Sequence, residues 1–190
     1  MTINVMRENM KWKIEKSEYL LNDKWIKVRA DKCIMPNGKV VEPYYVLEYP
    51  NWVNVVGVTE KNEIILVKTY RHGIGKELIE LPCGLIDNTD STPLEAAIRE
   101  LLEETGYTSN DFIQTGIVSA NPSNHNNLTY CFLAKNLQKI NSQALDETEE
   151  IEIVLTPINK VFEMLQKGQF LQALHVSSLY YAMNYLKENS

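Results

Sequence analysis

The sequence RELLEETGY, from Arg99 to Tyr107, contains three glutamates whose spacing could serve chemistry. Glu100, Glu103 and Glu104 are neighbours on one turn if this stretch is a helix. Like charges at helical spacing repel each other by roughly 0.2–0.5 kcal/mol per pair. The cluster therefore predicts a positively charged group against this face, although solvent is the commoner neighbour of an acidic helix face.

The residues before the cluster favour a metal ion over solvent. Pro82, Gly84 and the polar run DNTDS predict a shaped turn that leads straight into the helix. A backbone carbonyl in such a turn, together with several carboxylates, forms the oxygen-rich environment that Mg²⁺ or Mn²⁺ prefers. Because the net charge of the chain is −6, a divalent cation would also offset this acidity toward an anionic substrate.

Capping signals place the glutamates on a helix of defined length. Thr92 and Glu95 form a capping box with Pro93 at the first helical position, and Gly106 stands where a C-terminal cap belongs. At about 100° per residue, the three glutamates are predicted to lie together on the side away from the buried stripe. That stripe is expected to consist of Leu94, Ala97, Ile98 and Leu101.

Hydrophobic alternation predicts strands for most of the remaining chain. KWIKVRADKCIM and VVEPYYVLEY, on either side of the turn MPNGK, predict a small antiparallel sheet before Pro50. WVNVVGVT and IILVKTYR, separated by EKNE, predict a hairpin with one well-buried face. Further strands are expected at ELIELP, FIQTGIV, LTYCFLA and IEIVLTP. Strands interrupted by single helices indicate an α+β or mixed α/β domain.

Two helices are predicted after the last strand. Thr156 and Pro157 are expected to be the N-cap and the first residue of one helix, which Gly168 ends. The other is expected from about Phe170 to Leu186. Both carry apolar residues at helical spacing, so we expect them to contribute to the core rather than to a ligand site.

Composition limits the class of protein. The chain has 190 residues, of which 44% are hydrophobic, so it can bury the core of one domain with an appended subdomain. No basic tract is present, which argues against nucleic acid as a partner. Short apolar runs and the lack of an apolar signal core indicate no membrane association. Cys33, Cys83 and Cys131 show no Cys-x-x-Cys spacing, which predicts no disulfide framework and no zinc site and fits a reducing cytoplasm.

The segment from Gly84 to Tyr107 resembles the Nudix box, Gly-x5-Glu-x7-Arg-Glu-U-x-Glu-Glu-x-Gly-U, where U is an aliphatic or bulky apolar residue. The first half departs from the pattern, because Asp90 stands in place of the first glutamate and one extra residue precedes Arg99. That extra residue falls before the helix cap, where a loop can absorb it. The second half matches fully, at Arg99, Glu100, Leu101, Glu103, Glu104, Gly106 and Tyr107.

The resemblance reaches beyond the box and implies a fold and an assembly. KTYRHGIGKELIELPCGLID resembles the lead-in of the ADP-ribose pyrophosphatase branch, and Pro122 lies where that branch has a marker proline. The implied fold is α+β, with residues 49–190 forming an α/β/α Nudix sandwich around a mixed sheet. Residues 1–48 are expected to form a small N-terminal antiparallel β-sheet that builds a homodimer.

The resemblance also implies roles for residues of the box and its turn. Glu100 and Glu104 match the principal metal ligands, and the carbonyl of Cys83 matches the backbone ligand, which leaves its thiol without a role. Glu103 matches a further ligand or a proton-handling glutamate. Arg99, one helical turn before Glu103, is implied to orient it and is placed to pair with it.

Residues outside the box are implied to complete the site. Glu149 matches the loop carboxylate that joins the metal ions or acts as the base, with Glu147 as the alternative. Arg71 follows a strand and is a candidate for gripping the diphosphate, although a surface arginine is an equally common interpretation. Trp52 and Tyr70 are candidates for stacking on the base, with a place in the core as the alternative.

The activity implied by the resemblance is Mg²⁺-dependent hydrolysis of the pyrophosphate bond of a nucleoside diphosphate sugar, with Mn²⁺ as a possible substitute. ADP-ribose, split to AMP and ribose 5-phosphate, is the first candidate. The polar loop at residues 119–127 is expected to shape the specificity for the sugar, and His72 and His125 are expected at the surface. One alternative is another nucleotide sugar, such as GDP-mannose or ADP-glucose. Another is a Nudix-fold ligand sensor without turnover, which would not need the full set of glutamates.

Overall fold

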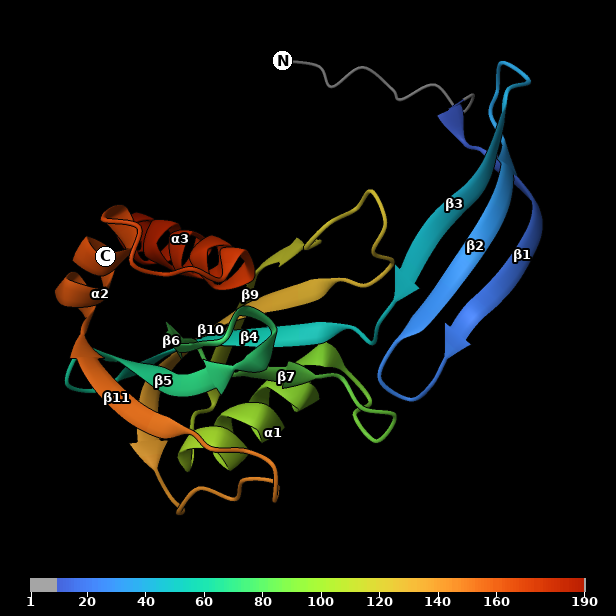
Figure 1. Ribbon diagram of the computed structural model, residues 1–190. Helices are drawn as coiled ribbons and strands as arrows, with labels where there is room; N and C mark the ends of the chain where they lie inside the picture. The colour runs from blue at the N-terminus through green and yellow to red at the C-terminus, as the bar shows by residue number, and fades with distance from the viewer. Residues whose placement is uncertain (1–9, 190) are drawn as a thin grey trace. The chain divides into compact units, whose positions relative to one another are not determined.

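The computed structural model describes residues 10–189, which belong to two compact units (Figure 1). One unit contains the chain up to Tyr49 together with Asn121–Asn127. The other contains Pro50–Ala120 and the chain from Leu128 onward. A segment from much later in the chain therefore joins the N-terminal unit, which a single boundary after residue 48 does not anticipate. The predicted start of that subdomain at residue 1 lies outside the described residues.

The N-terminal unit is a small antiparallel sheet, as predicted, with the strand order β1-β2-β3. A buried carboxylate, Asp31, lies within this sheet and accepts hydrogen bonds from Ser17 Oγ (2.6 Å) and from Nε of Arg29 (2.8 Å). Arg29 also pairs with Glu48, so the three strands are tied together by one ionic group. The strands are β1 (Lys13–Asn22), β2 (Lys27–Ile34) and β3 (Val40–Glu48).

The segment Asn121–Asn127 is held against the end of β3 by backbone hydrogen bonds. The N–H of Leu47 donates to the carbonyl of Asn124 (2.7 Å), and the N–H of Asn126 donates to the carbonyl of Leu47 (3.3 Å). The ring of His125 packs on Tyr49 with centroids 5.4 Å apart, so His125 is half-buried rather than a plain surface residue. The predicted role of this loop in specificity stays a prediction.

The larger unit is built on a mixed sheet with the path β11-β5-β4-β10-β8. β10 runs parallel to β4, whereas β6 pairs with β5, β7 with β4 and β9 with β10 in antiparallel fashion. The predicted fold class is therefore confirmed. The strands are β4 (Trp52–Thr59), β5 (Glu63–Arg71), β6 (Lys76–Glu80), β7 (Cys83–Leu85), β8 (Tyr107–Thr108), β9 (Asp111–Val118), β10 (Thr129–Lys139) and β11 (Glu152–Pro157).

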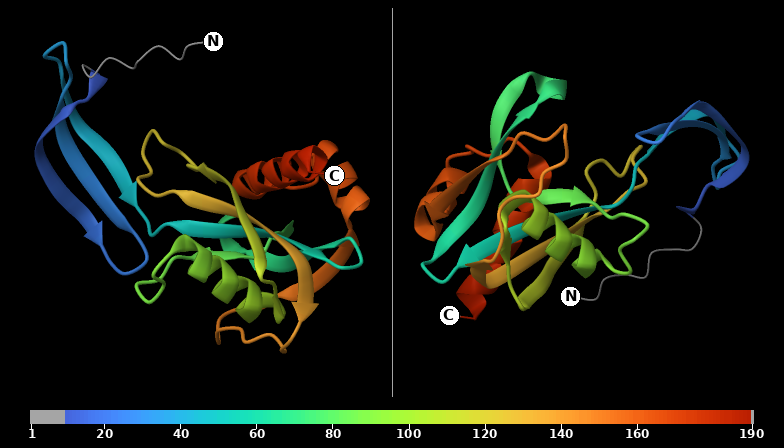
Figure 2. Two further views of the ribbon diagram at one scale, coloured as in Figure 1. Left: turned by 180° about the vertical axis from the view of Figure 1, so that it is seen from behind. Right: turned by 90° about the horizontal axis from the view of Figure 1, so that it is seen from below.

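Helices cover both faces of this sheet. α1 (Pro93–Thr105) lies on one face, and α2 (Ile158–Gln166) and α3 (Ala173–Glu188) lie on the other (Figures 1 and 2). Val55 packs on the α1 side with Leu101, and its neighbour Val56 packs on the opposite side with Leu179. Because the central strands are covered twice, Val53–Thr59 is buried at every residue, and the prediction of a single buried face is wrong.

The start of α2 differs from the prediction by one residue. Pro157 is the N-cap rather than the first helical residue, and the N–H of Ile158 donates to the carbonyl of Asn62 (3.0 Å). Thr156 still pairs with Ile64 in the β11–β5 ladder, so the strand keeps it out of the helix. The helix does end before Gly168, which has the left-handed φ of 66° that favours glycine.

The last helix begins three residues later than predicted. Gln172 precedes α3, and its side chain accepts a hydrogen bond from the N–H of Leu174 (3.4 Å). Phe170 lies before the helix and is buried in the core beneath it. Among the described residues, no helix combines the length and apolar character that crossing a membrane requires.

Candidate active site

The cluster of glutamates is positioned by the ends of α1, which form as predicted. Oγ1 of Thr92 accepts from the N–H of Glu95 (3.2 Å), and Oε2 of Glu95 accepts from the N–H of Ser91 (2.7 Å). At the other end, Gly106 has a φ of 74° and donates its N–H to the carbonyl of Leu102 (2.7 Å). These caps fix where the helix begins and ends, and its packing on the sheet then sets the direction of each glutamate.

The face on which the glutamates lie differs from the prediction. Glu104 is only 6% exposed and the side chain of Glu100 only 14%, whereas that of Glu103 is 44% exposed. Glu104 is seven residues from buried Ala97, which is two turns along the same face. The stripe that packs on the sheet consists of Ala96, Ala97 and Leu101, while Leu94 is exposed.

A close approach between α1 and the strand β7 explains Gly84. A Cβ atom at this position would collide with the carboxylate of Glu100. One residue earlier, the N–H of Cys83 donates to Oε2 of Glu104 (3.1 Å). The turn before the helix therefore contacts both buried carboxylates, Glu100 at Gly84 and Glu104 at Cys83.

Burial shifts the pKa values of both carboxyls, Glu100 and Glu104, upward. The pKa of Glu100 is raised to about 7, mainly by burial and also by the charges of Glu103 and Glu149, against the attraction of Arg99. Burial raises the pKa of Glu104 well above its ordinary value, although its bond from the Cys83 N–H opposes this shift. Two such groups side by side form a site that a cation would stabilise.

Arg99 connects the helix to the turn. Its guanidinium donates to both carboxylate oxygens of Asp90 (3.1 and 2.9 Å) and to the carbonyl of Leu85 (2.9 Å). It also donates to Glu100 (2.9 Å) and to Glu103 (3.0 Å), so the predicted pairing with Glu103 is present.

Asp90 occupies the position at which the sequence departs from the box. Its side chain is almost fully buried, and the hydrogen bonds from Arg99 lower its pKa. Asp90 therefore anchors the arginine despite the extra residue, because the loop adjusts before the helix starts.

Glu149 lies in an exposed turn just before β11. Its N–H donates to the carbonyl of Asp146 (3.0 Å), and its carboxylate accepts from the N–H of Asp146 (3.2 Å). Its charge lies near enough to raise the pKa of both Glu100 and Glu104. The choice of Glu149 over Glu147 as the carboxylate of the site stays a prediction.

Gln143 ties the loop that carries Glu149 to the end of α1. Its side-chain amide donates to the carbonyl of Glu104 (2.7 Å) and to that of Ile151 (3.1 Å). The N–H of Ala144 also donates to the carbonyl of Glu103 (2.9 Å). The loop is thus attached to the helix that bears the other carboxylates, an arrangement that no local sequence signal revealed.

Arg71 lies at the edge of this region and pairs with a buried carboxylate. Its Nε and Nη2 donate to Oε2 of Glu80 at 2.9 and 2.5 Å, and Nη2 lies 3.8 Å from Sγ of Cys83. Burial lowers the pKa of Arg71, but the hydrogen bond to Glu80 outweighs it together with nearby negative charges, so the pKa is raised overall. The charge of Glu104 is one of these contributions. Arg71 therefore lies near the carboxylates but is already paired.

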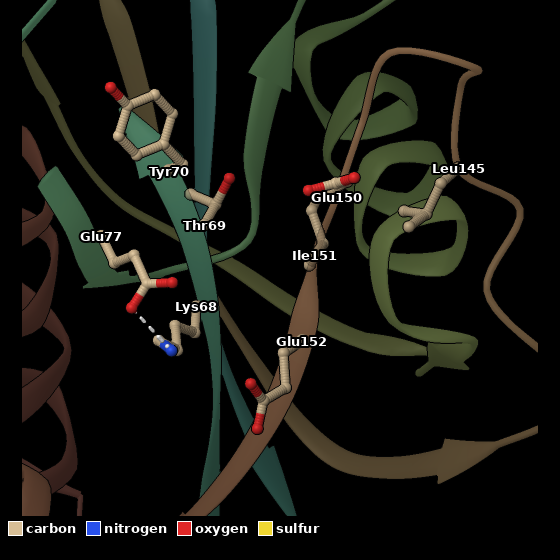
Figure 3. Close-up of a pocket in the computed structure, with 8 residues that line it drawn as sticks. All are labelled: Lys68, Thr69, Tyr70, Glu77, Leu145, Glu150, Ile151 and Glu152. Carbon is tan, nitrogen blue, oxygen red and sulfur yellow. Dashed lines mark ion pairs between the residues drawn. The ribbon is translucent and has the colours of Figure 1, made fainter. Parts of the chain in front are cut away.

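A pocket of about 440 Å³ opens beside Tyr70, between β5, β6 and the segment that follows Glu149 (Figure 3). Lys68 and Glu77 in its wall form an ion pair of 2.8 Å. Trp52 does not line this pocket; it begins β4 and pairs with Leu85 on β7. The lining residues are Lys68, Thr69, Tyr70, Glu77, Leu145, Glu150, Ile151 and Glu152.

The residues present fit a hard divalent cation. Glu100 and Glu104 are buried carboxylates with raised pKa values, and Glu149 adds a third carboxylate from another element. Oxygen donors of this kind suit Mg²⁺ or Mn²⁺. The carbonyl of Cys83 remains a predicted ligand, since its N–H is the group seen to contact Glu104.

Two polar residues beside the site were missed by the sequence analysis. Glu80 is 1% exposed and His175 is 3% exposed, and both lie close to the side chain of Cys83. Glu80 interrupts the apolar run of β6, and His175 is spaced four residues from Leu171 and from Leu179 on an apolar helix face. A charged or titratable residue in such a pattern is the signal that could have revealed them.

Comparisons with known proteins cover both units of the chain. Residues 49–174 match the model of the NUDIX domain, and residues 12–47 match that of the nucleoside diphosphate sugar hydrolase N-terminal domain. The chain is 27% identical over 171 residues to the ADP-ribose pyrophosphatase of Bacillus subtilis (strain 168), covering 90% of this chain and 89% of that protein. It is 25% identical over 167 residues to the methanol dehydrogenase activator of Bacillus methanolicus, covering 87% and 89%.

The fold also resembles a solved structure closely. The crystal structure of an ADP compounds hydrolase superposes with a TM-score of 0.85 at 26% sequence identity. The match covers 97% of this chain and 99% of that chain, so both units take part in it.

Proposed function

Because the chain belongs to the Nudix hydrolase family, we propose that it hydrolyses the pyrophosphate bond of a nucleoside diphosphate sugar. ADP-ribose is the first candidate, with AMP and ribose 5-phosphate as products. The names of the relatives support this substrate class. The observation that carries the proposal is the pair of buried carboxylates, Glu100 and Glu104, held by Arg99 and by the Cys83 N–H.

The residues that would hold Mg²⁺ are Glu100, Glu104 and Glu149, together with the carbonyl of Cys83. Such an ion supplies positive charge for the pyrophosphate and lowers the pKa of a bound water. Arg99 contributes by fixing the carboxylates of Glu100 and Glu103 before substrate arrives. This preorganisation means that the helix does not need to rearrange during the reaction.

The chain's other groups are assigned by their positions. Glu149 takes the proton of the attacking water, because it comes from a loop separate from the rigid helix and is within electrostatic reach of both buried carboxylates. Arg71 binds a phosphate oxygen, for which it must turn part of its guanidinium away from Glu80. Its side chain is 47% exposed, so it has room to do so.

The pocket beside Tyr70 supports a neutral, hydroxyl-bearing group as part of the substrate. Its wall carries Glu77, Glu150 and Glu152, and the one lysine there is paired. Carboxylates accept hydrogen bonds from sugar hydroxyls but repel a further phosphate. The exposed ring of Tyr70 offers a stacking surface. This lining favours a nucleotide sugar over a nucleoside triphosphate.

The assembly and location proposed for the protein are a homodimer in the cytoplasm. The N-terminal sheet exposes large apolar side chains on β1, including Ile14, Leu20 and Leu21. A three-stranded sheet of this size gains stability when such residues are covered. A second copy of the same unit would cover them.

A panel of nucleotide sugars tests the proposal. ADP-ribose, ADP-glucose and GDP-mannose would be incubated with the protein and Mg²⁺, and nucleoside monophosphate release would be measured with and without EDTA. We expect release from at least one sugar, strongest for ADP-ribose, and none with EDTA. Preferred hydrolysis of GDP-mannose would select the alternative substrate. Binding of these ligands without turnover of any would instead identify a sensor and overturn the proposal.

A further inference from the structure

A second cluster of metal-ligand side chains lies apart from the acidic one. Glu80 ends β6, Cys83 begins β7, and His175 lies in the first turn of α3. One ligand atom from each of these residues lies within 4.8 Å of the other two. We propose that Glu80, Cys83 and His175 form a binding site for a single Zn²⁺ ion, distinct from the carboxylate site on α1.

The donor atoms determine which ion this site would take. An imidazole nitrogen, a sulfur and one carboxylate oxygen suit zinc, whereas Mg²⁺ prefers oxygen donors alone. Three protein ligands leave a fourth position for water, which is common for zinc sites that are not purely structural. Burial lowers the pKa of His175 to about 3, so the imidazole is neutral and keeps a lone pair.

The distances fit zinc after small side-chain movements. Zinc bonds of about 2.0–2.3 Å in tetrahedral geometry place neighbouring ligand atoms roughly 3.5 Å apart. The present separations of up to 4.8 Å would close by about an ångström on binding. Glu80 and His175 come from different elements of a packed core, so the ion would join β6 to α3.

Two existing contacts compete with the ion. The guanidinium of Arg71 donates to Oε2 of Glu80 and lies 3.8 Å from Sγ of Cys83, so a cationic group already faces two of the ligands. The Nδ1 atom of His175 accepts a long hydrogen bond from the N–H of Leu81 (3.3 Å). Zinc would therefore displace Arg71 from Glu80 and repel it toward solvent.

This competition gives the site a consequence for the reaction. In the proposed function Arg71 turns only part of its guanidinium away from Glu80, so Glu80 still positions it. Zinc bound to Glu80 would remove that anchor and leave Arg71 misplaced for the diphosphate. The main chain of Cys83 also contacts Glu104 of the carboxylate site. Zinc bound through the Cys83 side chain would thus inhibit hydrolysis without occupying the magnesium ligands.

Cobalt spectroscopy tests the site without relying on activity. Co²⁺ would be titrated into the 190-residue protein in excess Mg²⁺, which occupies the carboxylate site. We expect one equivalent to produce the intense visible bands of tetrahedral cobalt and a near-ultraviolet thiolate-to-cobalt band, and Zn²⁺ to abolish both. A wild-type titration without the thiolate band would overturn the proposal.

Matched variants assign the band to its ligands. Cys83→Ser, which changes one atom, should remove the thiolate band. His175→Gln should weaken cobalt binding about tenfold or more, since removing even a residue that only hydrogen-bonds to a metal ligand lowers metal affinity by that much. Cys33→Ser and Glu104→Gln should keep the band. Persistence of the band in Cys83→Ser, or its loss in Cys33→Ser, would contradict the assignment.

Inhibition is a separate arm of the test. In saturating Mg²⁺, the zinc concentration that halves the activity should be about tenfold higher in Cys83→Ser than in wild type, each relative to its own uninhibited rate. Equal inhibition of both proteins would place zinc at the carboxylate site and refute the regulatory consequence. If none of the nucleotide sugars is hydrolysed, the proposed function fails, whereas the cobalt spectra still decide the zinc site.

Discussion

The N–H of Cys83 donates a hydrogen bond of 3.1 Å to Oε2 of Glu104, a carboxylate that is only 6% exposed. One backbone donor satisfies part of this group but does not neutralise its charge. The protein therefore maintains a buried carboxyl that would be more stable as a neutral group or with a cation beside it. Such a local cost to stability is expected of a binding site rather than of a structural helix face.

Replacing Glu104 by Gln should stabilise the metal-free protein. The amide keeps the size and an acceptor for the Cys83 N–H but removes the buried charge. We expect a higher melting temperature at pH 8, by roughly 2–4 °C for each kcal/mol gained, and a smaller gain at pH 5, because burial raises the pKa of the wild-type carboxyl and favours its protonated form as the pH falls. Calorimetry in EDTA measures this, with exposed Glu103→Gln as the control. A lower melting temperature for Glu104→Gln at pH 8 would show that the charge is compensated within the chain.

The stability of the metal-free protein should fall as pH rises. Burial raises the pKa of Glu100 to about 7 and that of Glu104 well above its ordinary value. Between the unfolded value near 4.5 and these raised values, the folded state binds more protons than the unfolded state. The stability due to these groups is therefore present at low pH and lost as pH rises toward 7 and beyond.

Mg²⁺ should oppose this loss, because it replaces the protons that the two carboxyls release. Denaturant unfolding at pH 5, 6, 7 and 8 with and without Mg²⁺ measures both effects. We expect the stabilisation by Mg²⁺ to grow with pH. Stabilisation that is equal at pH 5 and pH 8 would be inconsistent with ligands that must lose protons.

Glu149 and Glu147 provide a matched comparison for the proton acceptor. Glu149→Gln should lower kcat strongly and leave KM within a few-fold, because the interaction is made mainly in the transition state. Glu147→Gln should stay near wild type. The reverse pattern would mean that Glu147, two residues earlier in the loop, is the proton acceptor. If both variants are near wild type, the proton acceptor is to be sought among Glu100 and Glu103.

Arg71 and Glu80 should be coupled in stability but not in activity. Arg71→Ala leaves the buried Glu80 carboxylate without its partner, which costs about 3 kcal/mol, at the low end for a buried pair because Arg71 is half exposed. Adding Glu80→Gln should recover most of this loss. Activity should stay low in the double variant, since the group for the phosphate is still missing. Recovery of activity together with stability would make Arg71 structural only.

The dimer proposed for the N-terminal unit should depend on apolar residues of β1. Leu20→Glu places a charge among exposed apolar side chains and should yield monomers, whereas Lys16→Glu on the same strand should not. Light scattering at micromolar concentration measures the mass. An active wild-type monomer under these conditions would refute the proposed assembly.

Local signals in the sequence predicted where helices and strands lie, but they did not predict correctly which side chains are buried. Thr92, Pro93 and Gly106 determine where α1 begins and ends, because caps act within one turn. The direction of Glu104 depends on the sheet against which the helix packs, and the apolar stripe alone pointed to the wrong face. The three glutamates were predicted on the side away from that stripe, whereas Glu104 is buried beside Cys83 and only Glu103 is largely exposed.

Contacts between distant segments could not be predicted from the sequence. His175 reaches Cys83 only because α3 lies over the sheet, and Gln143 reaches α1 through an irregular loop. Neither residue belongs to a short motif, so the sequence does not show which distant residue each of them contacts. Similarly, Asn121–Asn127 joins the N-terminal unit by hydrogen bonds to Leu47 that no pattern in either segment announces.

The central claim is that the buried carboxylates of α1 serve hydrolysis of a nucleotide sugar. The most direct test is the rate of AMP release from ADP-ribose by wild type and by Glu104→Gln, at saturating Mg²⁺ and at equal folded concentration. We expect ready release by wild type and a rate lower by at least about a hundredfold in the variant, the scale of losing one group that stabilises the transition state. Equal rates of AMP release by the two proteins would contradict the assignment of this site.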